Sequence, residues 1–240
     1  MRGRRRRRPV ILATVFAAAC CLTVAIVAGT AARAELARKP TAGDLSAAAA
    51  AAVADRWRSW PAGRIFPADL GYSTGLLTQE TARRVGIAPG TACRGGVDPA
   101  LGRLAAREGC QAALRSTYVD QLEGVVYTVG VLAFPGGPRA RAFVRGIPRD
   151  RSAVIGVRAL AFPGTASAAF NDAARQASTV RRQGAYVVLT AAGYADGRPA
   201  AATMQHRDSV FAPAAQLAAE ILGPLTVPVT VSCQSPQWSC

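Results

Sequence analysis

The sequence predicts an α+β protein: an N-terminal transmembrane helix and a helical stalk, then one extracytoplasmic domain with an antiparallel sheet packed by helices on one face. Three observations lead to this prediction. An uncharged apolar run follows a cluster of arginines. Past residue 60, runs rich in Val and Tyr that read as strands alternate with helical patterns ending at Gly or Pro. Four cysteines also lie beyond the apolar run.

The N-terminal apolar run has the length and charge flanks of a membrane span. Residues 10–32 contain no Asp, Glu, Lys or Arg, and at about 1.5 Å per residue a helix of this length crosses a hydrocarbon core of roughly 30 Å. The arginines before it are Arg2, Arg4, Arg5, Arg6, Arg7 and Arg8. By the positive-inside rule they place residues 1–9 in the cytoplasm, residues 10–32 in the membrane and the remainder outside.

Three other interpretations of this N-terminus are weighed. A signal peptide would be cleaved after Ala34, releasing a secreted domain, but its apolar stretch is normally about 7 to 15 residues long and this one is longer. Lipidation of Cys20 lacks the usual preceding leucine. A nucleic-acid-binding arm rarely adjoins an apolar span, so nucleic acid is disfavoured as a partner. An uncleaved anchor is therefore preferred.

The charge outside the N-terminus is modest. Of 29 Lys and Arg residues nine precede residue 40, and of 14 Asp and Glu residues only Glu35 does, which leaves about +7 for the remainder. Such a charge gives a weak attraction to an anionic envelope, to phospholipid or to a teichoic-type polymer. The expected partners are the membrane and an envelope protein or anionic envelope polymer. The arginines are scattered, however, and an ordinary basic surface is the preferred interpretation.

The cysteines predict two disulfides. Cys20 and Cys21 fall in the span, which leaves an even set of four in the outer chain: Cys93, Cys110, Cys233 and Cys240. Nearness in sequence favours Cys93 with Cys110 and Cys233 with Cys240. Zinc is disfavoured because no pair has C-x-x-C spacing and His206 is the only histidine. No metal or cofactor is assigned.

Residues 33–60 are expected to form the stalk. The stretch from Asp44 to Trp60 is rich in alanine, the best helix former, and Pro61 ends it. Trp57 and Trp60 share one helical face. They are expected to pack on the domain rather than to lie in the bilayer interface, because about 25 residues separate them from the span.

The domain is predicted to cover residues 61–240, with elements assigned from caps, breakers and periodicity. The expected helices are 78–87 with Thr78 as cap, a helix capped by Asp98 that begins at Pro99 and ends at Gly109, one after Pro138, and one from Asp208 or Ser209 to Leu222. The expected extended segments are 64–67, 113–120, 124–134, 154–162, 177–182 and 185–195; the second with the third and the last two form antiparallel hairpins.

The pentapeptide LAFPG occurs twice, at 132–136 and 160–164. A duplicated half-domain would explain it, but the flanking residues do not match. A shared way of ending a strand in a turn is the preferred interpretation.

Catalytic motifs are weak. His206-Arg207-Asp208 imitates a kinase catalytic loop, but no glycine-rich phosphate loop accompanies it. With Ser209 it imitates a triad, for which near-adjacent residues have the wrong geometry. Asp120 and Glu123 bracket a hairpin turn, where carboxylates are ordinary. No catalytic residue is assigned.

The chain resembles a group of uncharacterised actinobacterial single-pass membrane proteins with an extracytoplasmic domain. The resemblance lies in the runs TYVDQLEGVVYTVGVLAFPGGPRARAF and AYVVLTAAGYADGR and in the tryptophan beside the last cysteine. The topology and cysteine use are also similar to the outer sensor domains of mycobacterial serine/threonine kinases, although only nine residues precede the span. The expected function is a non-enzymatic binding or accessory protein of the cell envelope. The alternative is a hydrolase-like envelope enzyme whose site one sequence does not reveal.

Overall fold

The computed structural model describes residues 7–36, 38–74, 78–148, 155–200 and 209–232. The chain divides between Leu45 and Ser46 into a unit that contains the first helix and a compact unit, Ser46–Val231. Each unit is described by itself.

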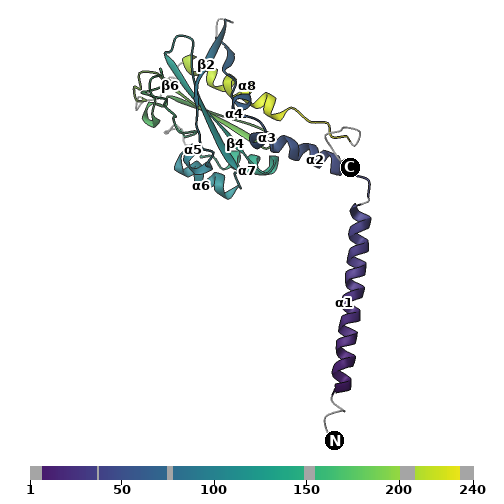
Figure 1. Ribbon diagram of the computed structural model, residues 1–240. Coiled ribbons are helices and arrows are strands. Elements are labelled where there is room, and N and C mark those ends of the chain that lie inside the picture. Colours follow the sequence, from purple (N-terminus) through teal and green to yellow (C-terminus); the bar gives the residue numbers. More distant parts are fainter. Residues whose placement is uncertain (1–6, 37, 75–77, 149–154, 201–208, 233–240) are drawn as a thin grey trace. The chain divides into compact units, whose positions relative to one another are not determined.

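A six-stranded antiparallel sheet forms the centre of the compact unit (Figure 1). Its strands lie in the order β1-β2-β3-β4-β6-β5. Their bounds are β1 Asp69–Ser73, β2 Gln79–Ile87, β3 Ala112–Val119, β4 Val125–Ala133, β5 Ala177–Gln183 and β6 Tyr186–Tyr194. The predicted hairpins are confirmed as β3–β4 and β5–β6.

Most of the helices are rich in alanine or have Pro or Gly at or next to an end. They are α1 Arg7–Leu36, α2 Ala42–Ala54, α3 Arg56–Ser59, α4 Ala62–Ile65, α5 Cys93–Gly96, α6 Pro99–Arg107, α7 Gly137–Arg145 and α8 Pro213–Thr226, with single 3-10 turns η1 Asp172–Ala174 and η2 Ser209–Phe211. The α+β class, with an apolar N-terminal helix before a sheet packed by helices, is confirmed.

One face of the sheet curls around α8. This helix contacts β1 at one edge of the sheet, β5 at the other, and β4 and β6 between them. Alternate residues of the central strands, such as Tyr127 and Val188, point to this face and are buried with Leu217 and Ile221 of α8.

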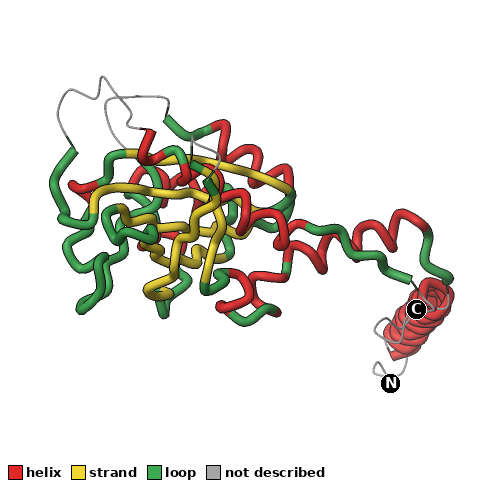
Figure 2. Tube along the Cα trace, turned by 90° about the horizontal axis from the view of Figure 1, so that it is seen from above, coloured by secondary structure: helices red, strands yellow, loops and turns green. Residues whose placement is uncertain are grey.

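The opposite face is covered as well, which corrects the expectation of a sheet covered on one side. The intervening residues of the same strands, such as Leu132 and Leu189, pack with Leu101 of α6 and Phe143 of α7. Figures 1 and 2 show helices on both sides of the strands. Burial on both faces explains why β4 is buried along its whole length and why its sequence lacks polar alternation.

The helix expected at 78–87 is wrong, because these residues form β2 between β1 and β3. Thr78 does not cap a helix; its carbonyl oxygen accepts from Thr74 N at 3.0 Å in the β1–β2 connection. Pairing on both sides outweighs the weak helical preference of the sequence. The extended entry expected at 64–67 is also wrong at its start, where α4 includes Arg64 and Ile65.

The strand expected at 154–162 is wrong in its described part, residues 155–162. Only Val157 makes a bridge, to Val97, and the rest is irregular. The first LAFPG ends β4, whereas the second lies in this irregular segment. The repeat is therefore not a shared strand end.

The helix ends differ in detail from those predicted. Asp98 stands at the N-cap position of α6 but makes no capping bond. The last helix runs past Gly223 to Thr226, with Pro224 inside its final turn, where the hydroxyl of Thr226 donates to Leu222 O at 2.8 Å. The chain from Asp44 to Ser59 is helical apart from a break at Asp55 between α2 and α3, and Trp60 lies just beyond the end of α3.

Candidate functional site

The apolar helix α1 is the first candidate. Within it, Val15–Glu35 is long and apolar enough to cross a membrane, and none of it is buried. The hydroxyl of Thr23 donates to Cys20 O at 2.9 Å and that of Thr30 to Val27 O at 3.0 Å. These bonds keep both polar side chains satisfied within the helix, as a lipid environment requires.

The predicted topology residues fall at the beginning of this helix. Arg7 and Arg8 are its first two residues. Arg2, Arg4, Arg5 and Arg6 lie outside the described residues.

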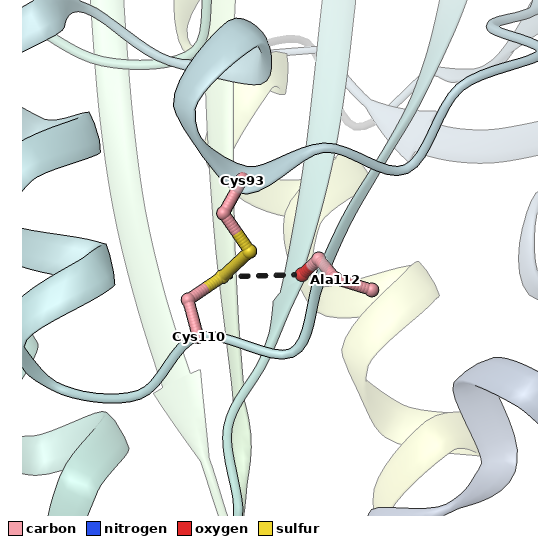
Figure 3. The surroundings of a disulfide bond; sticks show 3 residues. All are labelled: Cys93, Cys110 and Ala112. Carbon is pink, nitrogen blue, oxygen red and sulfur yellow. Dashed lines mark hydrogen bonds between the residues drawn. A yellow bond between two sulfur atoms is a disulfide. The ribbon is translucent and has the colours of Figure 1, made fainter.

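Cys93 and Cys110 form a disulfide, which confirms the pairing expected from their nearness in sequence. Their Cα atoms are 6.3 Å apart. The bond joins the start of α5 to Cys110, two residues before β3, and so brackets α6 (Figure 3). Cys110 Sγ lies 3.4 Å from Ala112 O; because a disulfide sulfur carries no proton, this is a contact rather than a donated hydrogen bond. Cys233 and Cys240 lie outside the described residues.

The segment from α2 to α4 is fixed to the core through two side chains. The Tyr186 hydroxyl, on β6, lies 2.9 Å from the carbonyl oxygens of Val53 and Ala54 and accepts from Trp57 N at 3.2 Å. Burial raises the pKa of Tyr186 to about 12, so it stays a neutral donor. Trp57 and Trp60 pack against the α8 face, as expected for domain packing.

The second of these side chains is Arg56, which is 8% exposed. It donates through Nη1 to Pro224 O at 3.1 Å and Leu225 O at 3.0 Å. These carbonyls lie in the last turn of α8, where a cation is electrostatically favoured. Arg56 begins the four-residue helix α3, and nothing in the neighbouring sequence indicates that it will bind a distant helix end, so sequence reasoning missed it.

The irregular segment after residue 155 is held on the sheet by two buried threonines. Thr117 donates to Leu160 O at 2.6 Å, and Leu160 N donates to Thr128 Oγ1 at 3.1 Å. The two hydroxyl oxygens are 3.2 Å apart. Since the Thr117 proton is used on Leu160, Thr128 donates to Thr117. Side chains thus satisfy the backbone groups that a seventh strand would otherwise pair.

A buried ion pair fixes the start of the same segment. Arg175 and Asp98 form two parallel bonds of 2.9 Å, and their side chains are 9% and 17% exposed. Asp98 Oδ2 also accepts from Gly156 N at 2.8 Å. This use of the carboxylate explains why Asp98 does not cap α6. Sequence analysis found Asp98 but had no signal for Arg175.

Asp172 extends this network. It accepts from Arg158 Nε at 2.9 Å and from Ala159 N at 2.8 Å. Burial acts to raise the pKa of Asp172, but these bonds and the charges of Arg158 and Arg175 outweigh it, so the pKa lies below its ordinary value. All of these interactions position the loop rather than face a cavity.

A pocket of about 320 Å³ lies beside this loop, where β2 bulges between Arg84 and Gly86. Its lining residues come from β2, the β3–β4 turn and the loop: Arg83, Arg84, Val85, Glu123, Gly164, Thr165 and Ala166. Arg83 pairs with Glu123 at 2.6 Å, and Thr165 donates to Phe162 O at 2.8 Å. The groups that line it are therefore partly charged and polar.

The carboxylate pair Asp120 and Glu123 belongs to the β3–β4 turn. Asp120 Oδ1 accepts from Val125 N at 2.8 Å, while Glu123 has a positive φ of 55° in the β3–β4 turn. His206, Arg207 and Asp208 lie outside the described residues, and of Ser209 only the backbone is described. Within the described chain, no three His, Cys, Asp or Glu side chains gather as a set of metal ligands.

Comparisons of the chain with protein-family models, with curated proteins and with solved structures found no match.

Proposed function

We propose that this chain is a membrane-anchored extracytoplasmic binding or accessory protein of the cell envelope. One observation carries the proposal: the apolar stretch Val15–Glu35 is entirely unburied. A helix that is apolar on all sides is stable in water only if something covers it, and a bilayer does so. In this proposal the N-terminal arginines stay in the cytoplasm.

The disulfide supports the outer location of the compact unit. Disulfides persist in oxidising compartments and are rare in the cytosol. Cys93 and Cys110 both lie in the compact unit. The pocket beside the β2 bulge gives this unit a surface for a small polar ligand.

The test is fractionation of cells that produce the full chain, with protease added to intact cells, followed by intact mass with and without reduction. We expect a membrane-bound, alkali-resistant protein whose outer part is removed by protease and whose Cys93 and Cys110 react with a thiol reagent only after reduction. A product that begins after Ala34 would show cleavage and a secreted domain. A protease-protected, reduced protein would refute the outer location.

A further inference from the structure

Arginine and tryptophan side chains gather on the short helices α3 and α4. Two guanidinium groups lie close to the Trp60 ring, with Arg64 Cζ at 3.8 Å and Arg56 Cζ at 4.9 Å from its centroid. Arg58 Cζ lies 4.9 Å from the ring centroid of Trp57. These five residues are here called the Arg–Trp cluster.

The three arginines of the cluster have few carboxylate partners. Asp55 pairs with Arg58 at 3.3 Å, but no other carboxylate among the described residues forms an ion pair with the cluster. Arg56 and Arg64 instead both lie close to the Trp60 ring centroid, at 4.9 and 3.8 Å. Burial is the main cause that lowers the pKa of Arg56, and the charge of Arg64 adds to it.

The geometry leaves the outer side of the cluster open to a ligand. Arg58 and Arg64 are exposed and Trp60 is half-buried, whereas Arg56 is fixed from below by the end of α8. A guanidinium stacked on an indole keeps its N–H edges free, and these edges match the oxygen pairs of a phosphate. Tryptophan is favoured where an apolar ring meets hydrated headgroups.

The position of the cluster in the chain identifies the phosphate. The apolar helix α1 ends at Leu36 and the cluster begins at Arg56. The chain between them, of which α2 contributes about 20 Å, is short enough for the cluster to reach the bilayer surface. Tethering gives a high effective concentration, so a weak attraction to each headgroup is sufficient.

We propose that the Arg–Trp cluster binds the phosphate headgroups of anionic lipids in the bilayer that α1 crosses. This proposal rests on the membrane anchor proposed above. It assigns the compact unit a second attachment to the membrane, sensitive to salt and to lipid charge.

The experiment places the full chain in vesicles of phosphatidylcholine alone or mixed equally with phosphatidylglycerol, and measures quenching of tryptophan fluorescence by lipids brominated near the headgroup. The substitution Trp238→Phe leaves Trp57 and Trp60 as the emitters. We expect several-fold stronger quenching in anionic vesicles, and a loss of this difference at high salt. Arg58→Gln with Arg64→Gln should abolish it.

Arg141→Gln with Arg145→Gln is the matched control, because both arginines are exposed on α7 and the charge change is equal. This control should keep the quenching. Alkali extraction of the same vesicles separates the two proposals. Protein that resists extraction but shows no lipid-charge-dependent quenching, or loses it equally in both double variants, overturns the cluster alone. Protein that is extracted overturns the anchor and the cluster together.

Discussion

At the scale of single residues, two buried threonines on neighbouring strands make opposite contributions to stability. Thr128 bonds with Thr117 and Leu160. Thr190 is equally buried, but its hydroxyl has no partner among the described residues. A buried hydroxyl without a partner is unfavourable, whereas removing one that is bonded leaves its partners unsatisfied.

We therefore expect Thr128→Val to lower the free energy of unfolding by about 1–3 kcal/mol, because Leu160 N loses its acceptor. Thr190→Val, the matched control, should leave it unchanged or raise it. Denaturant unfolding of the full chain in detergent measures both. A larger loss for Thr190→Val than for Thr128→Val would contradict this account of the loop.

The buried ion pair gives a second expectation at this scale. Asp98→Asn removes the two short bonds from the buried Arg175 guanidinium and leaves it only the longer pair with Asp172 at 3.6 Å, at an expected cost of about 3 kcal/mol. Asp196→Asn breaks an exposed pair with Arg198 and should change stability little. If both substitutions lowered the unfolding midpoint equally, burial of the Asp98–Arg175 pair would make no difference to its contribution to stability.

The lowered pKa of Asp172 predicts that the folded protein loses stability in acid. Its pKa is lower in the folded protein than in the unfolded chain, so its ionised form stabilises the fold above the unfolded pKa of about 4, and this contribution is lost as the pH falls through the folded value. Asp172→Asn should flatten the fall in thermal midpoint below about pH 4. If the thermal midpoint of the variant fell with pH as steeply as that of the unsubstituted protein, Asp172 would be excluded as a cause of the acid sensitivity.

At the scale of elements, the glycines of the sheet are not equivalent. A Cβ on Gly193 of β6 would lie 2.1 Å from Ala174 O and 2.7 Å from the Phe170 ring, whereas a Cβ on Gly71 of β1 would meet nothing within 4 Å. Gly193→Ala is expected to cost about 1–3 kcal/mol through forced displacement. Gly71→Ala should be neutral or slightly stabilising. Similar midpoints for both variants in thermal unfolding would refute the close approach.

The elements also show what the sequence could predict. The hairpins β3–β4 and β5–β6 were predicted because β-branched runs flank short turns. In contrast, the sequence of β2, QETARRVGI, predicts a helix because it begins with several helix formers and lacks the alternation of a strand. The apolar run after residue 154 is not a strand because Asp98, Asp172, Thr117 and Thr128 bond its backbone. Such long-range partners leave no local pattern.

Some of the candidate sites could likewise be predicted from the local sequence, and others could not. The apolar helix and the Cys93–Cys110 pair follow from composition and nearness. The contacts of Arg56 with the end of α8 and of Trp60 with two arginines depend on how distant elements pack. The pocket likewise combines β2, a turn and a loop that are far apart in the sequence.

At the scale of the whole molecule, the disulfide is expected to contribute about 3 kcal/mol, because it closes a loop with a sequence separation of 17. Replacing Cys93 and Cys110 by serine should lower stability by that amount and make α5 and α6 more sensitive to protease. Adding reductant to the unsubstituted protein should have the same effect. Replacing Cys20 and Cys21, which are unpaired and exposed in α1, is the control and should not affect the compact unit.

The position of α8 also sets the order of events during synthesis. Residues 213–226 occupy the inside of the curled sheet, yet they are made after all six strands. Cys93 and Cys110 emerge early and close together, so their bond can form while the chain is still growing. The concave sheet face, by contrast, remains uncovered until α8 arrives. Until its final segment is made, the nascent domain therefore exposes this apolar surface and is vulnerable to aggregation.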